Sequence, residues 1–282
     1  MILQLARGDS ACSLLPLAGG SIGSWRVAGQ YMLRAATSQG DPLQAASYPL
    51  VPYSNRIMNG RFEWNGRQIR LQPHPIAMPH SIHGVGWLHG WDVVESEADF
   101  AVLRYSHVGD ADWPWPFLAE QRFKLGPDSL TLDLLARNLA DEAVPLSFGH
   151  HPYFDSAGAS LQFTASGFCE NGNDDLPVSE TAVEGPRNFA LARPVGEQPF
   201  DNLYTDWHGE AEISWAGRAL GLDIESDLPH AQLYVPQGQT FFCFEPVAHR
   251  TDSVNRNQGD MPVVAPGETF SASIRFSALK AS

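Results

Sequence analysis

The sequence predicts an all-β protein, folded as one large antiparallel β-sandwich with only minor helix. Apolar and polar residues alternate along several segments, as expected of strands that bury one face. An Asn-Gly dipeptide joins two such segments, and no capped run of about twelve or more residues repeats at the helical period. The 25 glycines and 21 prolines are spread along the chain and divide it into short segments.

The clearest alternation predicts strands in four places. Within residues 129–136, Leu130, Leu132 and Leu134 share one face, and polar residues lie between them. The same period of two recurs in residues 120–125, 220–225 and 270–277. Each of these segments is expected to turn its apolar face toward a common core.

Asn65-Gly66 predicts a hairpin between residues 62–64 and 67–71, because both residues tolerate the positive φ angles of a type I′ turn. Residues 166–200 are rich in Gly, Asn, Asp, Pro and Glu, show little periodicity and are predicted to form a long loop region. Alternating strands continue on both sides of it. We therefore expect a single β-sandwich domain over residues 1–282.

Composition limits the possible partners. The 282 residues include 18 Lys and Arg against 32 Asp and Glu, a formal charge of −14, and only Lys124 and Lys280 are lysines. This balance argues against nucleic-acid binding through phosphates and against docking on an anionic membrane. A small-molecule ligand is expected.

Cys12, Cys169 and Cys243 lie far apart without C-x-x-C spacing, so we expect buried, reduced thiols. The N-terminal residues lack the basic and apolar regions of a signal peptide. No stretch approaches the roughly 18 apolar residues of a membrane span. The expectation is a soluble, cytoplasmic protein.

Four segments combine polar groups with aromatic residues and are candidates for a site: 52–56, 80–87, 148–154 and 242–246. Glu245 follows an apolar strand, so it either faces solvent at the strand end or is buried with a partner. For His150 and His151, the residues alone favour one surface His and one core His. Arg56 is either an exposed loop charge or, beside Asn55, a group that binds a polyhydroxyl ligand.

His80, His83 and His89 raise the question of a metal site. No two of them have the i, i+4 spacing of a helix or the i, i+2 spacing of a strand, which would point two ligands the same way. No metal site and no cofactor are therefore predicted.

The candidate segments occur in an order that resembles the aldose 1-epimerases (galactose mutarotases). N-R-I and the hairpin are followed by H-G, H-x-Y-F, an Asp-containing loop, Q-x-Y and finally E-P, over roughly Gly20 to Phe276. The resemblance implies a galactose mutarotase-like supersandwich and a sugar substrate. The chain differs from the common family pattern at His83-Gly84-Val85-Gly86, where H-G-G is usual, and at Gly149-His150, where an Asn usually precedes the acid His.

Carried over residue by residue, the resemblance implies that His151 is the general acid and Glu245 the general base. It also implies a sugar site lined by Asn55, Arg56, His83, Tyr153, Asp201 and Gln232. Opening the sugar ring requires one proton to leave the C1 hydroxyl and another to reach the ring oxygen. We expect the two groups to face each other across the ring, with the pKa of the His shifted slightly upward.

Three other functions stay open at this point. A hexose-6-phosphate 1-epimerase would need further cations, for which Arg122, Arg250 and Arg256 are available. A non-catalytic carbohydrate-binding module would not need both an acid and a base. A metal-dependent β-sandwich or cupin-like enzyme would use the His cluster.

Overall fold

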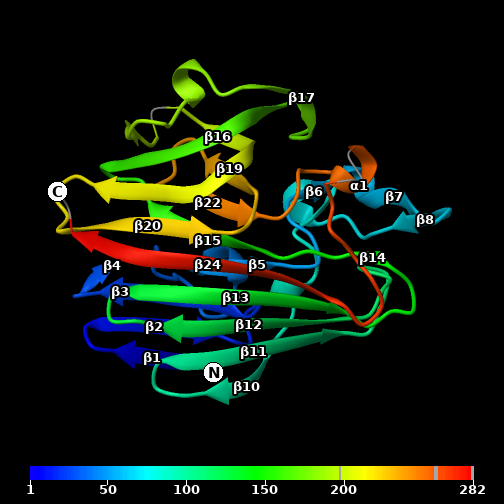
Figure 1. Ribbon diagram of the computed structural model, residues 1–282, viewed down its shortest axis with the longest axis horizontal. Coiled ribbons are helices and arrows are strands. Elements are labelled where there is room, and N and C mark those ends of the chain that lie inside the picture. The colour runs from blue at the N-terminus through cyan, green and yellow to red at the C-terminus, as the bar shows by residue number, and fades with distance from the viewer. Residues whose placement is uncertain (197, 257–259, 281–282) are drawn as a thin grey trace.

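The computed structural model describes residues 1–196, 198–256 and 260–280, and most of these residues lie in antiparallel strands (Figure 1). The strands of the first half are β1 (Leu3–Arg7), β2 (Ser10–Leu15), β3 (Ser21–Val27), β4 (Gln30–Tyr31), β5 (Ser47–Leu50), β6 (Arg56–Ile57), β7 (Arg61–Trp64), β8 (Arg67–Arg70), β9 (Ser81–Ile82), β10 (Asp92–Ser96), β11 (Phe100–His107), β12 (Phe117–Leu125) and β13 (Ser129–Asn138). Those of the second half are β14 (Val144–Pro145), β15 (Gly149–Asp155), β16 (Ala159–Asn171), β17 (Pro177–Ala182), β18 (Arg193–Pro194), β19 (Phe200–Trp215), β20 (Leu220–Ser226), β21 (His230–Val235), β22 (Phe241–Val247), β23 (Val263–Val264) and β24 (Thr269–Lys280).

Helix is minor, as predicted. The described residues contain one α-helix, α1 (Ser253–Arg256). Short 3-10 turns make up the rest: η1 (Pro42–Gln44), η2 (Met58–Gly60), η3 (Pro75–Ala77), η4 (Gly86–Leu88) and η5 (Gly185–Arg187). None of the described helices has the length and apolar character that crossing a membrane would require.

Two layers of strands form the body of the molecule. The first layer runs β10-β11-β12-β13-β24-β20-β19-β16, and Figure 1 looks onto its middle strands. The second layer runs β1-β2-β3-β5-β15-β22-β21-β19. The long strand β19 belongs to both layers, because residues 200–204 pair with β21 and residues 210–213 pair with β20.

Apolar side chains from the two layers pack into a continuous core. Trp25 of the second layer contacts Phe276 of the first, with ring centroids 6.3 Å apart. Leu130, Leu132 and Leu134 are fully buried, which confirms the inward face predicted for this strand. Most of the buried apolar residues of both layers belong to this one cluster. The single domain over residues 1–282 stays a prediction.

The predicted hairpin is confirmed. Strands β7 and β8 pair in antiparallel fashion, and Asn65 and Gly66 both have positive φ, 49° and 72°. With β6 and α1 the hairpin lies at one end of the body, on the right in Figure 1.

The prediction of a long loop over 166–200 is wrong. Strand β16 extends through the first residues of this stretch, β17 pairs with its second half, and β18 pairs with residues 160–161. Strand β17 is exposed at nearly every position, so neither of its faces needs apolar residues. The alternation that marks the core strands is absent for that reason.

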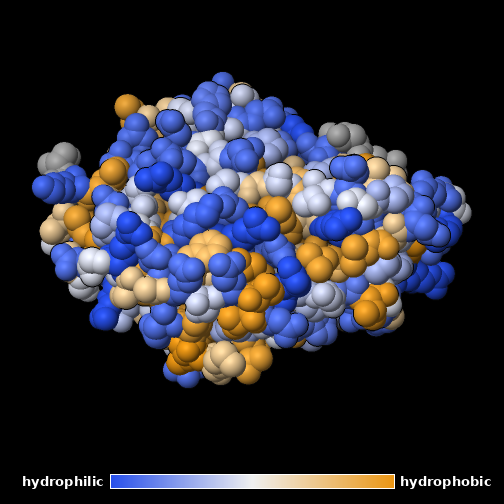
Figure 2. Space-filling view, turned by 60° about the horizontal axis from the view of Figure 1, so that its bottom comes forward, coloured by the Kyte–Doolittle hydropathy of each residue, from blue (hydrophilic) through white to orange (hydrophobic). Residues whose placement is uncertain are grey.

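Much of the surface in Figure 2 is hydrophilic, and the cysteines are buried. Hydrophilic side chains cover much of the face drawn in Figure 2, with hydrophobic residues scattered between them. The three cysteines are free and buried, as predicted.

Candidate active site

A cavity of about 630 Å³ lies on the face of the second layer that points away from the core. Strand alternation creates this face. Phe242 and Phe244 of β22 pack into the core, so Glu245, the next residue, points to the opposite side. The cavity is lined by Arg34, Thr37, Leu43, Gln44, Tyr48, Asn55, Arg56, Ile76, Ile82, His83, His151, Tyr153, Asp175, Asp201, Gln232, Tyr234, Phe241 and Glu245. All eight site residues expected from the sequence are among them.

His151 and Glu245 meet at the floor of this cavity. Strands β15 and β22 pair with Tyr153 opposite Cys243, and two residues further along this register places His151 beside Glu245. The Nε2 atom of His151 lies 3.2 Å from Oε1 of Glu245, and the two residues are 5% and 2% exposed. The structure therefore selects the buried, partnered arrangement of Glu245. The two groups touch each other, in contrast to the expected separation across a sugar ring.

Burial shifts the pKa values of His151 and Glu245 in opposite directions. It lowers the pKa of His151 to about 3, and the nearby Arg34 guanidinium acts in the same direction. It also raises the pKa of Glu245 well above its ordinary value. Repulsion by Asp201 adds to that rise, and attraction by Arg56 opposes it. The expectation of an upward shift for His151 is wrong, because desolvation penalises its charged form. Both shifts favour the uncharged forms, a neutral imidazole on His151 and a protonated carboxyl on Glu245.

His150 faces the core and takes no part in the cavity. Its Nε2 donates to Oε1 of Gln121 at 2.9 Å, and its Nδ1 contacts the Ser47 hydroxyl. Because β15 belongs to the second layer and β12 to the first, the bond between His150 and Gln121 connects the two layers. Gln121 also donates to the carbonyl of Gly20 at 2.9 Å. The expected surface His does not occur, since neighbouring strand residues point to opposite faces and here both faces are covered.

Two loops with unusual backbone geometry hold Asn55 and His83. Both residues have positive φ, 56° and 61°, which is costly for residues other than glycine. The His83 N–H donates to the Asn55 carbonyl at 3.0 Å, and the Asn55 N–H donates to Nδ1 of His83 at 3.1 Å. A Cβ on Gly84 would lie 2.3 Å from the Val51 carbonyl oxygen, so this position needs glycine.

This arrangement fixes the tautomer of His83. Burial lowers its pKa well below the ordinary value, so the ring is neutral. Since Nδ1 accepts a hydrogen bond, the proton resides on Nε2. His83 is therefore a donor in the cavity wall, and its ring lies 5.4 Å from that of His151 in an edge-to-face contact.

Arg56, Asp201 and Gln232 form a hydrogen-bonded chain along the wall. Nη2 of Arg56 donates to Asp201 at 3.3 Å and to Asp175 at 3.1 Å, and Nε2 of Gln232 donates to Asp201 at 2.7 Å. Arg56 is therefore a partly buried ion-pair partner, not the exposed loop charge that the sequence also allowed. The Oε1 atom of Gln232 is buried and has no partner among the described residues, which leaves an acceptor for a ligand hydroxyl.

Several wall residues have no signal in the sequence motifs. The rings of Tyr48 and Tyr153 lie 4.6 and 4.7 Å from that of His151. Arg34 lies over the ring of Tyr153 at 4.1 Å and has no carboxylate partner among the described residues. Asp175 comes from the stretch predicted to be a loop, and only its pairing with Arg56 marks it.

The further cations and histidines considered from the sequence lie elsewhere. Arg122, Arg250 and Arg256 do not line the cavity and pair respectively with Glu120, Asp260 and Asp252. Nδ1 of His80 accepts from the backbone of Asn59, and the ring of His89 stacks on that of Tyr105.

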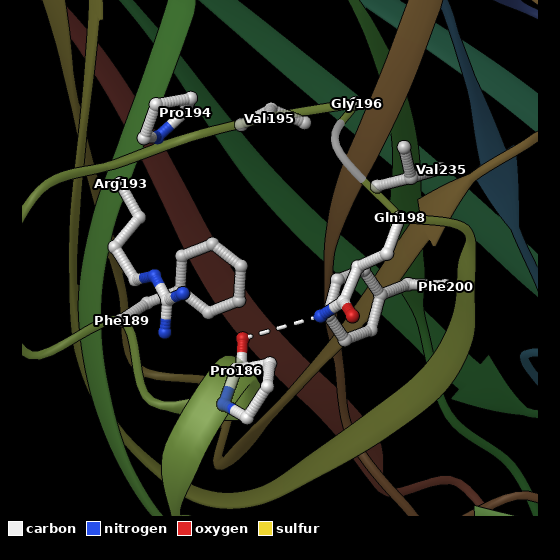
Figure 3. Close-up of a pocket in the computed structure, with 9 residues that line it drawn as sticks. All are labelled: Pro186, Phe189, Arg193, Pro194, Val195, Gly196, Gln198, Phe200 and Val235. Carbon is white, nitrogen blue, oxygen red and sulfur yellow. Dashed lines mark hydrogen bonds between the residues drawn. The ribbon is translucent and has the colours of Figure 1, made fainter.

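A second pocket, of about 250 Å³, lies beside η5 and β18 (Figure 3). It is lined mainly by Phe189, Phe200, Val235 and prolines, and Gln198 donates across it to the Pro186 carbonyl at 3.3 Å. Arg193 is the single titratable residue among its described lining residues. The described residues that line it include no acid–base pair, so the larger cavity is the candidate active site.

Comparison with known proteins gives a consistent result. The family described as "Aldose 1-epimerase" matches residues 1–277. The uncharacterised Escherichia coli K12 protein YphB is 30% identical over 281 residues, which cover 95% of each chain. A solved structure of an E. coli K12 protein proposed to be an aldose 1-epimerase has a TM-score of 0.93 and 28% identity, covering 100% of this chain and 99% of the other. A galactose mutarotase-like protein from Clostridium acetobutylicum, 18% identical, has a TM-score of 0.88 and covers 99% of this chain and 95% of its own.

Proposed function

Because the chain belongs to the aldose 1-epimerase family, we propose that it interconverts the α and β anomers of an aldohexose by opening and closing the sugar ring. The observation that carries the proposal is the buried contact between His151 and Glu245 on the floor of a polar cavity. A purely binding module has no need to bury an acid and a base against each other, since each pays a desolvation cost.

The chemistry requires two coupled proton transfers. The Glu245 carboxylate takes the proton of the C1 hydroxyl while His151 gives a proton to the ring oxygen, and the bond between C1 and the ring oxygen breaks. The aldehyde rotates about the adjacent carbon–carbon bond. In the reverse transfers the ring oxygen attacks the other face of C1, so each group ends in its starting protonation state.

The short distance within the pair suits this reaction. The hydroxyl that loses a proton and the ring oxygen that gains one are bonded to the same carbon, so the base and the acid must act at neighbouring points. A pair 3.2 Å apart meets this requirement without large movement. Because burial favours the uncharged forms of both groups, the reactive form with ionised Glu245 and protonated His151 is a minor tautomer of the form in which Glu245 carries the proton.

The remaining wall residues orient the sugar. Arg56 and the Nε2–H of His83 supply donors, and Asp201 and Oε1 of Gln232 supply acceptors for hydroxyl groups. Tyr48, Tyr153, Tyr234 and Phe241 supply the apolar surface that the ring carbons and C–H groups can cover.

Anomer exchange measured by NMR or polarimetry tests the proposal. The purified protein should accelerate interconversion of a freshly dissolved pure anomer above the spontaneous rate in the same buffer, across a panel of free and 6-phosphorylated hexoses. Acceleration confined to phosphorylated sugars would assign the alternative hexose-6-phosphate reaction. Sugar binding without any acceleration would contradict an enzymatic role.

A further inference from the structure

Cys243 lies beside the proposed acid–base pair on the same face of the sheet. Positions 243 and 245 of β22 share that face, and Tyr153, opposite Cys243, shares a face with His151. The imidazole nitrogen of His151, the sulfur of Cys243 and a carboxylate oxygen of Glu245 all lie within 4.8 Å of one another. Cys243 and Glu245 have the i, i+2 spacing that points two side chains of a strand to the same face, a spacing that no two of His80, His83 and His89 have.

These donor atoms suit a borderline-soft divalent ion. Zinc binds thiolate sulfur at about 2.3 Å and imidazole nitrogen or carboxylate oxygen near 2.0 Å, which places ligand atoms of a tetrahedral site about 3.3–3.7 Å apart. The 3.2 Å between His151 and Glu245 is close to that spacing, and the Cys243 sulfur, within 4.8 Å of both ligand atoms, would have to move closer by about 1 Å. Two of the three ligands line the cavity, which provides the entry path and an open fourth position.

The charge of the complex also favours binding. A divalent ion held by one thiolate, one carboxylate and one neutral imidazole is electrically neutral, which suits a buried site. Because thiolate, carboxylate and neutral imidazole are the metal-binding forms, binding would compete with protons for these side chains. Cys12 and Cys169 belong to no comparable group of ligands among the described residues.

We propose that His151, Cys243 and Glu245 form an inhibitory site for Zn²⁺ and similar thiophilic divalent ions. The bound metal occupies the two groups that the reaction needs for proton transfer, so the protein is active without metal and inactive with it. The inhibition rests on the proposed mutarotase function, whereas binding of the metal does not.

Cadmium titration tests binding directly. Chelator-treated, dialysed protein titrated with Cd²⁺ alone should develop the ultraviolet charge-transfer absorption of a cadmium thiolate at one equivalent. Cys243→Ala should abolish this band, and Cys243→Ser serves if the Ala variant is unstable. Cys169→Ala, which removes another buried thiol of the same apolar cluster, should leave it unchanged. Glu245→Gln should weaken Cd²⁺ binding by at least about tenfold.

Anomer exchange then tests inhibition. Zn²⁺ should inhibit the wild type and Cys169→Ala, with recovery on adding EDTA. Cys243→Ala should need at least about tenfold more Zn²⁺ than the wild type for half inhibition, measured against its own metal-free turnover. Absence of the band in the wild type, its persistence without Cys243, or equal Zn²⁺ sensitivity of the two proteins would overturn the proposal. If the proposed function alone fails, the metal-free protein shows no exchange but the cadmium band is still present.

Discussion

Arg56→Ala should weaken sugar binding far more than it slows the chemical step. The guanidinium lines the cavity and pairs with Asp201 and Asp175, whereas His151 and Glu245 pair with each other. A charge-assisted hydrogen bond to a ligand contributes about 1.5–3 kcal/mol. Since each 1.4 kcal/mol is a factor of ten, KM should rise about 10- to 100-fold, with a smaller loss in kcat.

The same substitution should change the pH profile. Arg56 lowers the pKa of both Asp201 and Glu245, so its removal raises both. The alkaline limb of kcat/KM, where the catalytic pair loses its proton, should therefore move to higher pH. Arg56→Lys is the matched control, because it keeps the charge and loses the planar fork, and it should give an intermediate KM and little shift of the limb. An unchanged KM in a folded Arg56→Ala protein would remove Arg56 from the site.

Turnover should survive dialysis against EDTA, because the acid–base pair needs no Lewis acid; loss of activity restored by one added metal would contradict a metal-free reaction. The pH profile of kcat/KM should be bell-shaped. Burial lowers the pKa of His151 and raises that of Glu245, so the pair keeps its single proton between these values, gains a second proton at low pH and loses its only proton at high pH. A flat alkaline side measured by anomer exchange would refute this assignment. Asp201→Asn removes a charge that raises the pKa of Glu245, so the alkaline limb should move to lower pH, and an unmoved limb would count against the coupling. In a double-mutant cycle, Glu245→Gln combined with His151→Asn should cost much less than the product of the single effects, because the two groups act as a unit; near-multiplicative losses would exclude concerted roles.

Local patterns predict the strands that build the core. The alternation around Leu132 and the Asn65-Gly66 turn report positions whose conformations depend on near neighbours and on a single buried face. Strand β17 escapes prediction because it is an exposed edge strand whose pairing partner, β16, is held by other strands.

Some features of the candidate site also follow from local sequence motifs, and others depend on the whole fold. Motif order predicts His151 and Glu245 as site residues, but their mutual contact depends on the register of two strands about ninety residues apart in sequence. Arg34 and Asp175 reach the cavity from segments without any motif, so only the packing of the whole sandwich reveals them. The direction of the His151 pKa shift likewise depends on burial, which no single segment encodes.

The rate of anomer exchange by Glu245→Gln tests the central claim most directly. Gln preserves the shape of the side chain and removes the base, so kcat should fall by about 10² or more while sugar binding persists. Glu120→Gln, which alters another buried glutamate outside the cavity, should leave turnover near the wild-type value. If Glu245→Gln retains near wild-type turnover above the spontaneous rate, the contact between His151 and Glu245 is not the catalytic centre.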